Sequence, residues 1–233
     1  MHVWRADLND AGDELVELLS ATEHTRAAAI AGERQRLLWS RSRGVLRELL
    51  GRYLREDACA IELAVGAHGK PRLVGAHSGL GDGGESELHF NLSHSRDLAL
   101  YAFAATGPVG VDVQFAREHD DASHTDEHNS GRGARKYVAL ARRTFGEDSA
   151  ERLAALDYES REREFLRLWT RHEAELKRIG LGIGGGAQDA ANGEAAANRS
   201  DGAAIVELDA APDAAAALAL GWRASELRRW DWR

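Results

Sequence analysis

The sequence has little cysteine, little proline and no long hydrophobic run. Its 233 residues contain one cysteine, Cys59, and three prolines. A single cysteine excludes an internal disulfide framework, and the apolar neighbours of Cys59 favour a buried strand thiol over a nucleophile. The chain lacks a stretch of about 18 uninterrupted apolar residues, and its first residues lack a basic segment followed by an apolar one. We therefore expect a soluble, cytoplasmic protein without membrane contacts.

Positive charge is also in the minority. Lysine and arginine number 30 against 38 aspartates and glutamates, which gives a formal net charge of −8. Binding to nucleic acid normally needs a net or clustered basic surface that neutralises phosphates. This composition therefore argues against a nucleic-acid partner, and any basic site must be local. The hydrophobic content of 43% suffices for the core of one large domain or two small ones.

The hydrophobic pattern predicts helices and short strands in both halves of the chain, which indicates an α+β fold. Helices are expected over 12–29, 33–54, 134–145, 147–157 and 159–180. Strands are expected over 2–8, 59–65, 70–73, 88–92, 98–104, 109–113, 203–208 and 214–222. Small and polar residues at 75–87 and 184–200 indicate loops, and the two tryptophans of the tail are expected to cover the core.

One stretch, residues 165–180, presents a carboxylate and an ammonium on the same helix face. Trp169, Glu173 and Lys177 recur every four positions and therefore line up along that face. The indole can anchor the row in a core while the two charges reach into a cleft. The alternative is a surface helix with a Glu–Lys pair, which is common and contributes only about 0.2–0.5 kcal/mol.

Three further motifs precede this helix. They are Gly69-Lys70-Pro71, the run Phe90-Asn91-Leu92-Ser93-His94-Ser95, and the run Val109-Gly110-Val111-Asp112-Val113-Gln114. A lysine between a turn glycine and a proline has little backbone freedom, so its ammonium can be aimed. An ionised carboxylate such as that of Asp112 is costly to bury unpaired among valines, so we expect it at a sheet edge or on a metal.

In this order, and ending in the run from Trp169 to Ala174 with Lys177 and Gly180, the motifs resemble those of the 4'-phosphopantetheinyl transferases of the surfactin-synthetase-activating (Sfp) type. The resemblance implies an α+β pseudodimer, in which one chain forms two similar subdomains with coenzyme A in the cleft between them. It also implies that the protein is a monomer. The expected subdomains are residues 1–108, which would contact coenzyme A, and 109–233, which would carry the magnesium ligands and the active-site helix.

The resemblance also implies an activity. Such enzymes transfer the phosphopantetheine arm of coenzyme A to a serine hydroxyl of an apo acyl, peptidyl or aryl carrier protein, and release adenosine 3',5'-bisphosphate. The pathway would be polyketide, nonribosomal peptide, fatty acid or lysine synthesis. The cofactor would be Mg²⁺, with Mn²⁺ as an alternative, held by Asp112, Glu173 and Gln114. Glu173 would act as the base, and Lys177 would neutralise the phosphate and the departing charge.

The coenzyme A contacts follow from the same resemblance. The run from Ser42 to Arg47 is similar to an SRxxLR motif and favours Arg43, and Arg26 matches a basic position upstream of it. The full set of implied contacts is Arg26, Arg43, Lys70, Ser93, His94, Asp112 and Lys177.

Two departures from the family pattern support an alternative function. Many relatives have glutamate at the position of Gln114 and lysine at the position of His172, so this chain has one carboxylate and one cation fewer. The alternative is a catalytically weakened relative that binds coenzyme A or a carrier protein without efficient transfer. A generic acidic interaction domain is a third hypothesis, and it treats all the motifs as chance.

Residues 116–133 are polar and contain His119, His124 and His128. Their spacing fits no compact zinc pattern, so we interpret the segment as a solvated loop. Between the Asp112 strand and the Trp169 helix lies a set of basic residues that would overhang the cleft and bind the carrier protein: Arg132, Arg135, Lys136, Arg142 and Arg143. A solvated helix is the alternative for this set.

Overall fold

A computed structural model describes residues 1–66, 69–74, 88–116, 127–181, 204–222 and 226–233, without the side chains of 127–134. The helices are η1 (Asp13–Leu18, a 3₁₀ helix), α1 (Ala21–Ala28), α2 (Glu33–Leu54), α3 (Glu127–Phe145), α4 (Glu147–Ala154) and α5 (Tyr158–Ile179). The strands are β1 (His2–Asp7), β2 (Leu63–Val65), β3 (Pro71–Leu73), β4 (His89–Ser95), β5 (Leu98–Ala104), β6 (Val109–Phe115), β7 (Ala204–Glu207), β8 (Ala214–Leu220) and β9 (Arg228–Asp231).

This mixture of helices and strands confirms the predicted α+β class, and α2 has the predicted bounds. The helix expected over 12–29 is divided into η1 and α1. Ser20 is the reason, because its side chain accepts a hydrogen bond from the Glu23 amide while the Glu23 carboxylate accepts one from the Ser20 amide. This capping box starts a new helix at Ala21.

The prediction for Cys59 was wrong. Cys59 is exposed and lies in a turn after α2, and β2 begins only at Leu63. The cause is Asp57, whose side chain accepts a hydrogen bond from the Cys59 amide at 2.9 Å and whose carbonyl accepts one from the Ala60 amide at 2.9 Å. Such local bonds give the backbone an alternative to strand pairing.

The loop predicted over 116–133 was partly wrong, because the backbone is helical from Glu127 onward in α3. Residues 117–126, with His119 and His124, lie outside the described residues, and so does the side chain of His128. The loops predicted at 75–87 and 184–200 also fall outside them. Strand β9 was not predicted, since its sequence Arg-Arg-Trp-Asp is largely polar and shows no apolar alternation.

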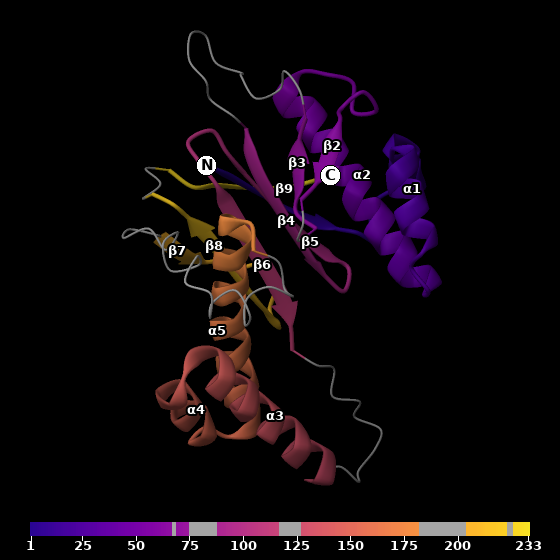
Figure 1. Ribbon diagram of the computed structural model, residues 1–233. Helices are drawn as coiled ribbons and strands as arrows, with labels where there is room; N and C mark the ends of the chain where they lie inside the picture. The colour runs from indigo at the N-terminus through magenta and orange to yellow at the C-terminus, as the bar shows by residue number, and fades with distance from the viewer. Residues whose placement is uncertain (67–68, 75–87, 117–126, 182–203, 223–225) are drawn as a thin grey trace.

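The strands form a four-stranded sheet in the order β4-β5-β1-β9, a hairpin β2-β3 and a three-stranded sheet in the order β6-β8-β7 (Figure 1). Strand β5 is buried along its whole length because its two faces are both covered. Ala99, Tyr101 and Phe103 pack with the apolar face of α2. Leu98, Leu100, Ala102 and Ala104 face a second core shared with β6 and β8.

Strand β6 determines which residues meet α5. Its valines, Val109, Val111 and Val113, lie in the second core, so the alternate residues Gly110 and Asp112 belong to the opposite face. A Cβ atom on Gly110 would lie 2.0 Å from the Ala174 carbonyl oxygen in α5. Glycine at this position therefore allows α5 to lie directly against β6 and brings the α5 side chains to Asp112.

Helices α3 and α4 pack against the first half of α5 and form a lobe below the sheets in Figure 1. The lobe has its own apolar cluster, which includes Tyr137, Leu153 and Phe165. Trp169 packs against this cluster, with its ring centroid 5.8 Å from that of Phe165. The indole therefore anchors the predicted row in a core, as expected. No helix in the described part of the chain has both the length and the apolarity needed to cross a bilayer.

Candidate active site

The predicted motifs meet at a pocket of about 270 Å³. It is lined by the helix α2, the turn before β3, the strands β4 and β6, and the C-terminal end of α5. The lining residues are Trp39, Ser42, Arg43, Gly69, Lys70, Pro71, Asn91, Leu92, Ser93, His94, Asp112, Gln114, Lys177, Gly180 and Leu181. Residues from both sides of the predicted boundary at 108/109 therefore contribute to it, while the boundary itself stays a prediction.

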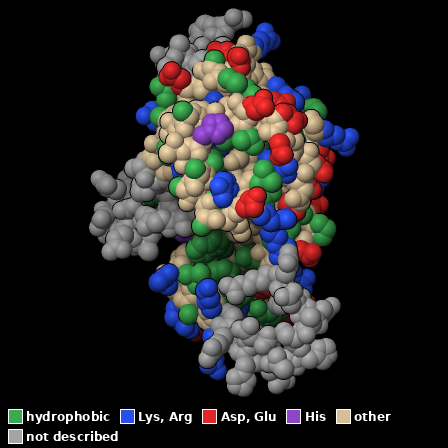
Figure 2. All heavy atoms as spheres, turned by 90° about the vertical axis from the view of Figure 1, so that its right-hand side faces the viewer, with side chains coloured by type: hydrophobic (Ala, Val, Ile, Leu, Met, Phe, Trp, Pro, Cys, Tyr) green, Lys and Arg blue, Asp and Glu red, His purple; other side chains and the backbone are tan. Residues whose placement is uncertain are grey.

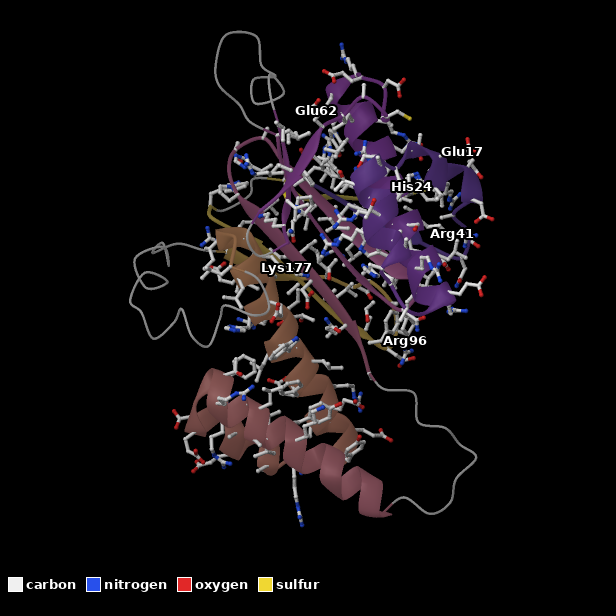
Figure 3. The ribbon with its side chains drawn as sticks, turned by 45° about the vertical axis from the view of Figure 1, so that its right-hand side comes forward. Glu17, His24, Arg41, Glu62, Arg96 and Lys177 are labelled. Carbon is white, nitrogen blue, oxygen red and sulfur yellow. The ribbon has the colours of Figure 1, made fainter. Side chains whose placement is uncertain are left out.

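Asp112 and Lys177 form a partly buried ion pair in the lining of this pocket. The Lys177 Nζ atom lies 2.6 Å from Asp112 Oδ1 and donates to Ser93 Oγ at 2.9 Å and to the Val111 carbonyl at 3.2 Å. Ser93 Oγ in turn donates to Asp112 Oδ1 at 2.8 Å. Asp112 is 1% exposed, so these partners offset the cost of burying its charge. Figure 3 shows Lys177 where α5 meets the strands.

Glu173 lies one helical turn before Lys177 and is only 3% exposed. Its Oε2 atom is buried and has no hydrogen-bond partner among the described residues. Burial and the nearby charge of Asp112 raise the pKa of Glu173 to about 6, although Lys177 acts in the opposite direction. The surface-helix alternative for the row is therefore wrong, because Glu173 is buried and Lys177 pairs with Asp112.

The donor atoms beside this orphaned oxygen fit a hard divalent cation. Magnesium prefers oxygen ligands and is usually held by one or two carboxylates together with substrate phosphate and water. Asp112 and Glu173 supply the carboxylates. Gln114 lines the same pocket, and its Nε2 atom lies 3.4 Å from Asp112 Oδ2. Within the described residues no group of three His, Cys, Asp or Glu side chains is arranged for a metal.

The opposite wall of the pocket carries cations. Arg43 is 8% exposed, and its Nε atom has no hydrogen-bond partner in the described part of the structure. Its guanidinium lies over the Trp39 ring, 5.2 Å from the centroid, and the Arg26 guanidinium lies 5.9 Å from the same centroid. Burial, followed by repulsion from Arg26 and Arg47, lowers the pKa of Arg43, while Glu23 opposes this. A buried cation with an unused donor is a suitable partner for an anion.

Lys70 adds a second cation to this wall, and His94 adds an imidazole. Lys70 Nζ donates to the Val109 carbonyl at 3.0 Å and to the Lys177 carbonyl at 2.7 Å, so one of its three donors remains for a ligand. Burial and the charges of Arg178 and Lys177 lower the pKa of Lys70 to about 8. His94 is exposed at the pocket. Partial desolvation of its imidazole by the surrounding protein, followed by the charges of Arg43 and Lys177, lowers its pKa.

All the predicted site residues except Arg26 and Glu173 line this pocket. Arg26 lies against the Trp39 ring, and Glu173 lies one helical turn before Lys177 on α5. Trp39 and Asn91 were missed. The spacing of Trp39 and Arg43 at i,i+4 on an expected helix could have indicated that they share a face. Asn91 alternates with Ser93 on a strand and so shares its face.

Comparison with known proteins agrees with this geometry. A sequence model of the 4'-phosphopantetheinyl transferase superfamily matches residues 108–221. The 4'-phosphopantetheinyl transferase HetI of Nostoc sp. is 33% identical over 186 residues, covering 78% of this chain and 70% of the relative. A candidate 4'-phosphopantetheinyl transferase of Synechocystis sp. is 30% identical, covering 72% of this chain and 60% of the relative. The 4'-phosphopantetheinyl transferase psf-1 of Bacillus pumilus is 29% identical, with coverages of 66% and 56%.

The pocket combines the Asp112 carboxylate with the cations of Arg43, Lys70 and Lys177, an arrangement that suits an anionic substrate. The chain belongs to the 4'-phosphopantetheinyl transferase superfamily.

Proposed function

We propose that this protein transfers the 4'-phosphopantetheine arm of coenzyme A to a serine hydroxyl of an apo carrier protein, in the manner of the Sfp type, with the described pocket as its active site. The observation that carries the proposal is the orphaned carboxylate of Glu173, whose pKa the charge of Asp112 raises, together with the cations Arg43 and Lys70 that line the same pocket as Asp112. A pyrophosphate needs both features, since its charge requires cations and its metal requires carboxylates.

The cationic wall binds the phosphates of coenzyme A. Arg43 offers its unused Nε donor, and Lys70 offers the donor that no backbone carbonyl occupies. The imidazole of His94, neutral at pH 7 because its pKa is lowered, donates one N–H. Arg26 supports the Trp39 ring and adds charge at longer range.

Glu173 acts as the base that receives the proton of the incoming serine hydroxyl, directly or through water. Its raised pKa makes it a better proton acceptor than an ordinary carboxylate while it stays ionised near neutral pH. The serine oxygen forms the new bond to phosphorus, and the bond to the adenosine bisphosphate oxygen breaks. Lys177, held by Ser93 and Asp112, neutralises the charge of the phosphate and of the leaving group.

Asp112, Glu173 and Gln114 are the residues that would hold Mg²⁺, with Mn²⁺ as an alternative. A bound divalent cation supplies charge neutralisation at the pyrophosphate. Gln114 would contribute an amide oxygen and no charge, where many relatives contribute a carboxylate.

The carrier protein docks on the basic residues of α3. Arg135 and Lys136 are exposed, which keeps them available to an acidic partner, whereas Arg142 is bound to Glu147 at 2.7 Å. Figure 2 shows hydrophobic side chains gathered at the waist above the α3–α5 lobe, with lysine and arginine side chains beside them. A local surface of this kind suits a partner that the net charge of −8 would not attract over a distance.

Incubation of the protein with coenzyme A, Mg²⁺ and a panel of apo carrier proteins tests the function, with intact mass as the readout. A mass gain equal to that of the phosphopantetheine arm is expected within a single turnover. Binding of coenzyme A without mass gain on any carrier would instead favour the catalytically weakened relative.

A further inference from the structure

Strands β4 and β6 are edges of different sheets, yet they lie side by side (Figure 1). No backbone ladder joins them among the described pairings, since β4 pairs with β5 and β6 pairs with β8. An unpaired edge leaves a row of N–H and C=O groups that must find other partners when buried. Asp112 lies in the middle of this edge of β6.

Side chains of β4 accept the exposed N–H groups of β6. Asn91 Oδ1 accepts from the Val111 amide at 2.8 Å, Ser93 Oγ from the Val113 amide at 3.4 Å, and Ser95 Oγ from the Phe115 amide at 3.4 Å. Each bond joins residues 20 positions apart, so the two strands run parallel in a fixed register. The polar side chains at alternate positions of Asn-Leu-Ser-His-Ser therefore accept the hydrogen bonds that backbone carbonyls would accept in a paired strand.

The carbonyl groups of the same edge are bound by the lysines of the pocket. Lys70 donates to the Val109 carbonyl, and Lys177 donates to the Val111 carbonyl. Asn91 and Lys177 together thus bind both backbone groups of Val111, the residue directly before Asp112. Asn91 is 3% exposed, and its bond to Val111 is the shortest of the three bonds from β4 side chains.

We propose that Asn91 is a positioning residue for the transfer reaction, because its amide oxygen fixes the Val111 backbone and thereby the placement of Asp112 against Lys177 and Glu173. The inference rests on the proposed function of the pocket. It gives the asparagine of the motif a role that is separate from contact with coenzyme A. A carboxylate displaced by about 1 Å can lower a catalysed rate about 100-fold, so a single backbone bond at this place is consequential.

The test compares Asn91→Leu, which keeps the size and removes the acceptor, with Asn91→Ser, which supplies the hydroxyl acceptor that Ser93 and Ser95 already use. For Asn91→Leu we expect kcat to fall about 10- to 100-fold while the KM for coenzyme A stays within about twofold. Asn91→Ser should recover most of the lost kcat. Should Asn91→Leu fail to fold, Asn91→Ala provides the same comparison with a smaller side chain.

Amide hydrogen exchange in the ligand-free protein provides a readout that does not depend on activity. The Val111 amide should exchange at least about tenfold faster in Asn91→Leu than in the wild type, and Asn91→Ser should restore the protection. Tyr53→Phe is the control, because it removes hydrogen bonds to His2 and Trp4 away from the pocket and should leave kcat unchanged.

Two results would overturn the inference. One is an unchanged Val111 exchange rate in Asn91→Leu. The other is a raised KM for coenzyme A with unchanged kcat, which would make Asn91 a ligand contact. A wild-type protein that transfers nothing would overturn the proposed function instead, and the exchange measurement would then decide separately whether Asn91 fixes the Val111 backbone.

Discussion

The two walls of the pocket differ in how their charges are satisfied. On the wall formed by β6 and α5, Asp112 is bound by Lys177 and Ser93, and the lysine is bound by a backbone carbonyl as well. On the wall formed by α2 and the turn at Gly69, Arg43 has an unused donor, and its guanidinium rests on an aromatic ring. Asp112 and Lys177 are thus satisfied within the protein, whereas Arg43 Nε and Glu173 Oε2 have no hydrogen-bond partner among the described residues and can bind an anion and a cation.

This difference separates two tasks within one pocket. A wall with internal partners holds its groups in place before the substrate arrives, which is the condition for electrostatic stabilisation of a transition state. A wall with unused donors contributes binding energy only when phosphate is present. Substitutions in the first wall should therefore affect the rate, and substitutions in the second should affect affinity.

The largest effect is expected from Asp112→Ala and Glu173→Ala. Each variant should lose most transfer activity, at least about 100-fold in kcat, because each removes one of the two carboxylates at the site. Intact-mass assays measure the transfer, and circular dichroism checks the fold. Near-wild-type transfer by a folded variant of either residue would remove it from the metal site.

The second wall is tested by Lys70→Ala, Arg43→Ala and His94→Ala. Charge-assisted contacts contribute about 1.5–3 kcal/mol each, so the affinity for coenzyme A should fall by about one to two orders of magnitude. Calorimetry measures the affinity, and kcat at saturating coenzyme A should change less than KM. Unchanged binding in all three variants would contradict the assignment of this wall to phosphate.

Glu173→Gln should stabilise the metal-free protein while abolishing transfer. The pKa of Glu173 is raised to about 6 in the folded protein, so ionisation of the carboxyl opposes folding above that pH and does so less as the pH falls toward its ordinary value. The gain at pH 8 should be about 1–2 kcal/mol. It should shrink toward pH 4.5, and thermal melts in chelator at both pH values measure it. A lower melting temperature of Glu173→Gln than of the wild type at pH 8 would show that the ionised Glu173 carboxylate does not destabilise the fold.

The pH dependence of coenzyme A binding gives a finer test of Lys70. Its pKa of about 8 means that the ammonium is lost as the pH rises through that value, whereas bound phosphate favours the protonated form. The affinity in the presence of chelator should therefore fall above pH 8, by at most about tenfold per pH unit. Lys70→Arg is the control, because arginine does not titrate in this range. An equal slope for both proteins would remove Lys70 as the source.

The smallest effect concerns the carrier protein. Reversal of Arg135, Lys136 and Arg142 to glutamate should raise the KM for the carrier protein several-fold, about 1 kcal/mol in total, and leave the KM for coenzyme A unchanged. The three residues lie on α3, and none of them lines the pocket.

A matched control reverses Arg52, Arg55 and Arg229, which are exposed and lie on α2, at its end and on β9. This variant changes the net charge by the same amount and should leave both constants unchanged. A carrier KM that does not move, or that rises equally in the control, would place docking elsewhere.

Local patterns predicted much of this site. The four-residue repeat on α5 and the lone aspartate in β6 could be read from the sequence, because helix and strand periodicity place side chains without knowledge of the fold. The meeting of Asp112 with Lys177, 65 positions apart, was available only through the family resemblance.

Other features depend on contacts that no local pattern encodes. The acceptor role of Asn91 requires two sheet edges to face each other, and strand β9 forms by pairing with β1 at the other end of the chain. The exposed turn at Cys59 depends on local hydrogen bonds that Asp57 accepts from the Cys59 and Ala60 amides, and these outweigh the strand pattern of the neighbouring residues. In each case a tertiary or capping interaction decided what the periodicity left open.

Strand β9 has a consequence for how the protein is made. It pairs in parallel with β1, and the ion pair between Arg5 and Asp231 spans 226 positions. Closing a loop of that length costs about 5 kcal/mol of chain entropy, which the stacking of Trp230 on Trp4 and the bond from Trp232 to Glu48 help to offset. During synthesis the first sheet cannot be completed until residue 231 has left the ribosome, so the nascent chain keeps an open edge at β1 while all the residues between β1 and β9 are translated.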